Sequence, residues 1–261
     1  MDFYNDDHTK KQYHYEYVVD HVCDQKEKVK VSDLVKRLIE QVAFEARGSE
    51  FVDKKSGVSA RLTISAFENA VSAAERRAIV NNEKDTQVWI NDLMGIIPSI
   101  TGKIELVYEG EQEGPYQVAM NLLEKAIRTQ FIQYFPNPEV LKKRARTGKP
   151  EPEGKQDNPY RSITSWFDKG NNLNIFFNTT DKDKILLLYK VDGLHSLVKK
   201  YFPHANEMET ALLMEFILHG LSSYSLISKK ILETKVEFKD LIGSMMNLGN
   251  KNYEEEFDEE G

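Results

Sequence analysis

The stretch that decides the fold is residues 60–80, which read A-R-L-T-I-S-A-F-E-N-A-V-S-A-A-E-R-R-A-I-V. Apolar side chains recur in it every three to four positions, the period of an amphipathic helix. They are Leu62, Ile64, Phe67, Val71, Ala74, Ala78 and Ile79. Asn81 and Asn82 follow and mark a turn. The pattern predicts a helix over 60–80 with one face in a core.

Two flanking segments also predict amphipathic helices. Residues 32–47 begin at Ser32, a good N-cap, and stop at Gly48. The predicted apolar face consists of Leu34, Val35, Leu38, Ile39, Val42 and Phe44. A long helix is predicted over 115–135, because proline suits the first helical position. Its predicted face consists of Val118, Leu122, Ala126, Ile127 and Phe131.

The remaining segments give shorter elements. We predict a short strand at 86–90, a short helix at 93–97 ended by Pro98, and a charged turn at 110–115. Further helical signals lie at 163–167, 185–189, 194–198, 207–228 and 237–246. The fold class is therefore predicted to be mainly α, a helical bundle with at most one short β element and a C-terminal helical extension.

Composition divides the chain into five parts. They are a polar lead-in at 1–30, a helical domain at 31–136, a linker rich in Pro, Gly and charge at 137–160, a helical domain at 161–250 and an acidic tail at 251–261. With a net charge of −7, a nucleic-acid partner is not expected. No apolar run approaches the roughly 18 residues of a membrane span, and the first residues form no signal core. The single cysteine fits a reducing compartment, so we expect a cytoplasmic protein.

The catalytic motifs of common enzyme families are missing from the sequence. Gly102 and Lys103 suggest a phosphate loop, but six residues separate Gly102 from Gly95 where that loop needs four, and an isoleucine follows the lysine. No Walker B strand, Gly-x-Ser-x-Gly elbow or His-Glu-x-x-His pair occurs either. His195 and His219 are expected to pack at helix surfaces. This chain alone is therefore not expected to hydrolyse nucleotides.

Arginines are the best candidates for contact with a ligand. Arg61 lies in the first turn of the 60–80 helix, after Gly57-Val-Ser59-Ala. Its guanidinium is a planar fork suited to phosphate, although an exposed arginine paired with a carboxylate is the alternative. Arg76 and Arg77 share this ambiguity and lie where cations suit the helix dipole.

Metal ligands are sparse. His14, His21 and Cys23 could bind a metal, but their spacing is not that of a closed site, and a polar lead-in is the alternative. The acidic turn at 109–114 could bind a cation, although turns are commonly acidic. We predict no metal site.

Four long strings of the sequence resemble a known family. They are VAFEAR (42–47), FVDKKSGVSARLTISAFEN (51–69), SAAERR (72–77) and IPSITGKIELVYEGEQEG (97–114). They resemble the C-terminal half of bacterial AAA+ ATPases of the magnesium-chelatase subunit I and MoxR-like kinds. The resemblance is dense over 31–136 and continues more weakly to about 246.

The resemblance implies an AAA+ lid at 31–136 in which Arg61 is the sensor-2 arginine, with Gly57 and Ser59 beside it in the cofactor-binding segment. It further implies ATP and magnesium in the complete enzyme, though none for this chain alone. The partners would be a nucleotide-binding core in the same or a neighbouring chain, a homo-oligomeric ring and a client protein. The alternative is a stand-alone, non-catalytic helical adaptor that binds protein partners.

Overall fold

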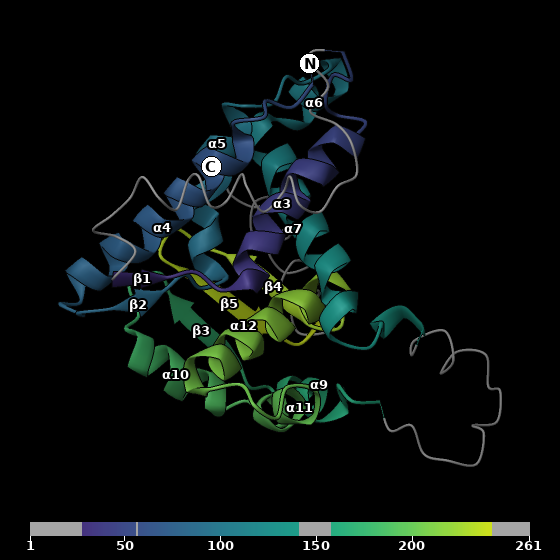
Figure 1. Cartoon of the computed structure of the whole chain (residues 1–261). Coiled ribbons are helices and arrows are strands. Elements are labelled where there is room, and N and C mark those ends of the chain that lie inside the picture. Colours follow the sequence, from purple (N-terminus) through teal and green to yellow (C-terminus); the bar gives the residue numbers. More distant parts are fainter. Residues whose placement is uncertain (1–27, 56, 141–157, 242–261) are drawn as a thin grey trace, which may run out of the picture. The chain divides into compact units, whose positions relative to one another are not determined.

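The computed structural model of the protein describes residues 28–55, 57–140 and 158–241. They form two compact units, unit 1 up to Ala126 and unit 2 from Ile127. Both are mainly helical, as the helical periodicity predicts (Figure 1). The boundary falls inside helix α7 (Pro115–Tyr134), which therefore belongs to both units. The acidic tail and most of the polar lead-in lie outside the described residues.

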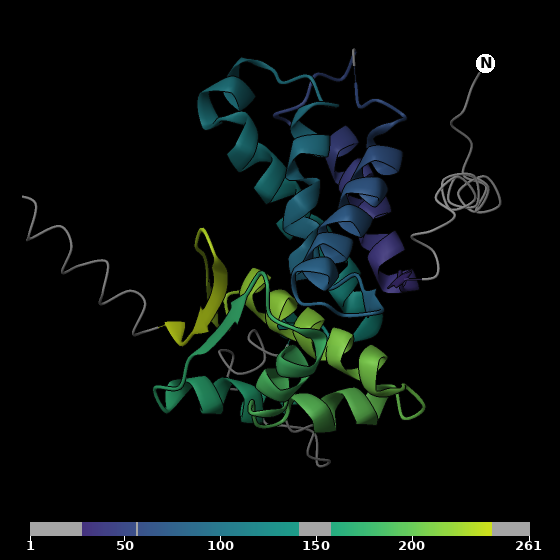
Figure 2. The same ribbon diagram turned by 90° about the vertical axis from the view of Figure 1, so that its left-hand side faces the viewer.

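Unit 1 is built on three helices. Helix α3 (Asp33–Gly48) begins at Ser32, whose hydroxyl accepts a hydrogen bond from the backbone N–H of Val35 at 3.3 Å. It packs against α4 (Leu62–Val80), and Lys125 of α7 forms an ion pair with Glu45 of α3 at 3.3 Å. Figure 2 shows the three helices side by side. All five predicted face residues of α7 are buried.

Two residues of the predicted apolar faces are exposed instead. Phe44 in α3 is 44% exposed and Ile79 in α4 is 71% exposed. Each follows a buried alanine, Ala43 or Ala78, and a helix turns by about 100° per residue. Both side chains therefore point away from the buried stripe, and the prediction was wrong for them.

Short elements complete unit 1. Strand β1 (Val29–Lys30) pairs in parallel with β2 (Thr86–Gln87), so the strand predicted at 86–90 is shorter than expected. A 3-10 helix η1 (Asn91–Ile96) leads into α5 (Ile97–Thr101), and α6 (Tyr108–Glu113) precedes α7.

Two predictions about this part of unit 1 were wrong. Pro98 does not end a helix but lies in the first turn of α5, where its missing N–H needs no partner. The charged turn predicted at 110–115 is largely the helix α6. Gly110 permits this helix to approach the chain closely, because a Cβ there would lie 2.4 Å from the carbonyl oxygen of Phe51.

Helix α12 (Glu207–Ser223) is the centre of unit 2. Asn206 and Glu209 form a capping box at its start, and every residue from Thr210 to Leu221 is buried. The helices packed around it include α10 (Asp181–Tyr189) and α11 (Leu194–Tyr201). A further helix, α9 (Arg161–Asp168), lies in the same unit. Within the described residues, no helix is long and apolar enough to cross a membrane.

A three-stranded antiparallel sheet also belongs to unit 2. Its order is β3 (Leu173–Phe176), β5 (Lys235–Lys239), β4 (Ser228–Ile231). The prediction of at most one short β element was therefore wrong. Buried and less buried residues alternate along β5, the period of a strand, and this strand occupies the start of the helix predicted at 237–246. The helix predicted at 207–228 ends earlier, at Ser223, and β4 begins at Ser228.

Candidate functional site

The predicted site lies in the loop at 51–61, which precedes α4. This loop is described except for Ser56, and it pairs with residues 103–107 in unit 1. Two antiparallel bridges join the segments, Val52 with Leu106 and Val58 with Ile104. The backbone N–H of Ser59 also donates to the carbonyl oxygen of Lys103 at 3.0 Å. The loop is therefore held along its length by main-chain hydrogen bonds.

Gly57 and Ser59 set the path of the chain into α4. Gly57 has a φ of +72°, a left-handed conformation that favours glycine, and its N–H donates to the carbonyl oxygen of Asp53 at 3.0 Å. The Ser59 hydroxyl accepts from the N–H of Arg61 at 3.3 Å, and the Ser59 carbonyl accepts from the N–H of Leu62 at 3.0 Å. These contacts fix the backbone at Arg61.

Arg61 is the N-cap residue of α4, and its side chain is exposed. Within the part of the chain that the structure describes, its guanidinium has no hydrogen bond or ion pair. The alternative of an arginine neutralised by a carboxylate is therefore not observed among these residues. The side chain presents a planar cation to solvent from a fixed backbone, an arrangement suited to a phosphate or carboxylate.

Arg77, at the other end of α4, has a different role. It is 3% exposed, and its Nε and Nη2 donate to the two carboxylate oxygens of Asp92 at 3.3 and 3.1 Å. Nη2 also lies 3.0 Å from both the Thr86 hydroxyl and the Gln87 carbonyl oxygen. Arg77 therefore joins α4 to β2 and η1, whereas its neighbour Arg76 is exposed. The ambiguity between ligand contact and internal pairing is resolved for Arg77 in favour of pairing.

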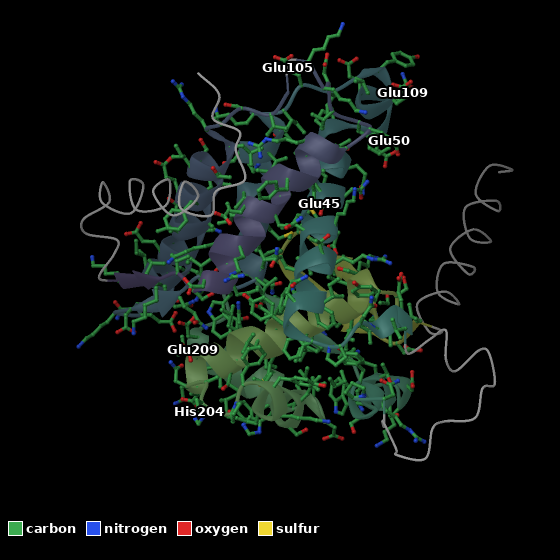
Figure 3. The ribbon with its side chains drawn as sticks, turned by 45° about the vertical axis from the view of Figure 1, so that its right-hand side comes forward. Glu45, Glu50, Glu105, Glu109, His204 and Glu209 are labelled. Carbon is green, nitrogen blue, oxygen red and sulfur yellow. The ribbon has the colours of Figure 1, made fainter. Side chains whose placement is uncertain are left out.

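Acidic side chains gather at one end of unit 1. Figure 3 shows Glu50, Glu105 and Glu109 near this end, with Glu45 further along α3. The described residues contain no group of three or more His, Cys, Asp or Glu side chains that could hold a metal ion. His14, His21 and Cys23, the other candidate ligands, fall outside the described residues.

His219 is the residue that sequence reasoning misplaced most clearly. It was expected at a helix surface but is fully buried in α12, because this helix is covered on all sides. Burial, and then the nearby ammonium groups of Lys229 and Lys184, lower its pKa well below the usual value. The signal available in the sequence was a histidine inside a long apolar run. His195 is exposed on α11, as predicted, and its ring lies 5.0 Å from that of Tyr189.

No model of a known protein family, no curated protein and no solved structure matches this chain. The resemblance to the magnesium-chelatase subunit I and MoxR-like ATPases therefore rests on the quoted strings alone. The assignment of Gly57, Ser59 and Arg61 to a nucleotide site stays a prediction.

Proposed function

We propose that this chain supplies the lid and C-terminal region of an AAA+ ATPase of the magnesium-chelatase subunit I or MoxR-like kind, with Arg61 as its sensor-2 arginine. The observation that carries the proposal is the exposed guanidinium of Arg61, which has no partner among the described residues. Ser59 and the pairing with residues 103–107 hold the backbone from which it projects. A cation held in this way is suited to an anion on another domain.

In the complete enzyme, a nucleotide-binding core in the same or a neighbouring chain would hold ATP and magnesium. The Arg61 guanidinium would then bind the γ-phosphate of this ATP. Arginine is effective at this position because negative charge develops on the transferred phosphoryl group. After ATP is hydrolysed and the γ-phosphate is released, Arg61 loses this contact and the lid shifts against the core. In a cytoplasmic homo-oligomeric ring, the shift would be passed to a client protein, with no membrane or nucleic acid involved.

Arg61→Ala is expected to lower ATP turnover by the complete enzyme about tenfold or more, as loss of a phosphate-contacting arginine does. Arg76→Ala is the matched control, because it removes an exposed arginine from the same helix. Turnover is measured by phosphate release at saturating ATP, and thermal unfolding confirms that both variants fold. Equal turnover in wild type and Arg61→Ala would remove Arg61 from the site.

The adaptor alternative is tested by the size of the native polypeptide. An immunoblot of source cells with an antibody against residues 31–136 is expected to show a band well above 30.1 kDa, with room for a nucleotide-binding core of about 150–200 residues. A band at 30.1 kDa, together with no ATPase subunit in the purified complex, would favour the stand-alone adaptor.

A further inference from the structure

Unit 2 encloses a charged cluster that the proposed function does not use. Its members are Lys184 of α10, Glu215 and His219 of α12, and Lys229 of β4. Lys184, Glu215 and His219 are each 0% exposed. Burying charge is costly unless the groups compensate each other. The Lys184 ammonium lies 3.5 Å from a carboxylate oxygen of Glu215, which compensates one of the two lysines.

The second lysine, Lys229, is partly buried and contacts the histidine. Lys229 Nζ lies 3.3 Å from His219 Nδ1. An ammonium group can only donate, so Nδ1 must be the unprotonated, accepting nitrogen of a neutral imidazole. Phe238 of β5 meets the ring edge-on, with centroids 5.3 Å apart. The neutral histidine is thus in contact with both strands of the hairpin formed by β4 and β5.

We propose that His219 is an acid-sensitive switch, which holds the β4–β5 hairpin on α12 while its ring is neutral and releases the hairpin when the ring gains a proton. A protonated ring could no longer accept from Lys229. It would also place a third cation beside Lys184 and Lys229, and both ammonium groups oppose the protonation of this ring. Phe238, which also contacts the ring, carries no negative charge that could pair with a protonated imidazole.

The direction of the pH dependence follows from linkage. Burial and the two lysines lower the pKa of His219 in the folded state, whereas release of the hairpin exposes the ring and raises its pKa toward the ordinary value of about 6.5. Between these values the released state binds more protons, so acid favours release. The contact of His219 with the hairpin therefore contributes its full stabilising free energy above about pH 6.5. This contribution decreases as the pH falls toward the lowered pKa of His219.

The test is amide hydrogen exchange of residues 228–239 in the full chain from about pH 7.5 to about pH 5, corrected for intrinsic exchange rates. In wild type, protection is expected to fall as the pH drops below about 6.5, by up to about tenfold for each pH unit. His195→Gln, which removes an exposed histidine, is expected to keep this profile, whereas His219→Gln is expected to lose the pH dependence. The same fall in His219→Gln as in wild type would overturn the proposal.

A second variant keeps the test decisive if His219→Gln does not fold. Lys229→Met leaves His219 in place but removes one of the two cations that oppose its protonation. The fall in protection is then expected to begin at the same pH and to level off at a higher pH than in wild type. A profile that coincides with that of wild type would mean that Lys229 does not act on His219, and would overturn the switch.

Discussion

Replacing Arg77 with methionine is expected to lower the free energy of unfolding of unit 1 by about 3–5 kcal/mol, the cost of breaking a buried ion pair by removing one partner. The Asp92 carboxylate, whose side chain is 7% exposed, would lose its cation. The carbonyl oxygen of Gln87 and the hydroxyl of Thr86 would lose a donor in the interior. Methionine fills similar space but can make none of these hydrogen bonds.

The chain contains two tryptophans, Trp89 in unit 1 and Trp166 in unit 2. The loss of stability can therefore be measured in unit 1 alone by fluorescence. Trp89 is fully buried beside the network, and its backbone N–H donates to the Asp92 carboxylate at 2.8 Å. In a Trp166→Phe background, urea unfolding followed by Trp89 fluorescence reports on unit 1. Arg76→Met, on the same helix but exposed, is expected to stay within about 0.5 kcal/mol of the parent. A loss for Arg77→Met as small as that of the control would contradict the role of the network.

The long helices could be predicted because each carries its own signal. Helix α7 begins at Pro115, and α3 follows the N-cap residue Ser32. Both helices also have an apolar stripe that can be recognised from the local sequence alone. Burial of single residues was less predictable. Phe44 and Ile79 are apolar, yet they lie one position beyond the buried stripe and face outward.

The sheet of unit 2 could not be predicted in the same way, because its strands are short and their partners are distant. Strand β5 alternates over only five residues, and Val236 pairs with Ile175 of β3 far earlier in the chain. A short alternating run is ambiguous between strand and helix until such a partner is known. The helix predicted at 237–246 is the error that follows from this ambiguity.

The sequence placed Arg61 at the start of α4, but it could not distinguish the surroundings of the arginines. Arg76 and Arg77 are adjacent, and a turn of about 100° separates an exposed side chain from a buried one. Only the folded chain brings Asp92 to Arg77 and leaves Arg61 without a carboxylate among the described residues. The burial of His219 likewise depends on the elements packed around α12.

Gly220→Ala is expected to lower the free energy of unfolding of unit 2 by about 3 kcal/mol, the upper end of the usual cost of overpacking a core. A Cβ at this position would lie 2.0 Å from Cδ2 of Phe131. The ring cannot withdraw easily, because it is fully buried and packed against other rings at centroid distances of 5.5–6.0 Å. These rings belong to Phe135, Tyr160, Phe216 and Tyr224. The clash outweighs the gain of about 1 kcal/mol that alanine brings to a helix interior.

Hydrogen exchange of the α12 amides measures this loss, because their slowest exchange reports the stability of unit 2. Gly48→Ala is the control for the change from glycine to alanine, since Gly48 is also helical but lies in α3 of unit 1, where an added Cβ meets no packed neighbour within 4 Å; it is expected to leave the exchange of the α12 amides unchanged. Phe131→Leu combined with Gly220→Ala should recover part of the loss, because the smaller side chain makes room for the methyl group. If Gly220→Ala were as stable as wild type, helix α12 and Phe131 could not pack as closely as the structure shows.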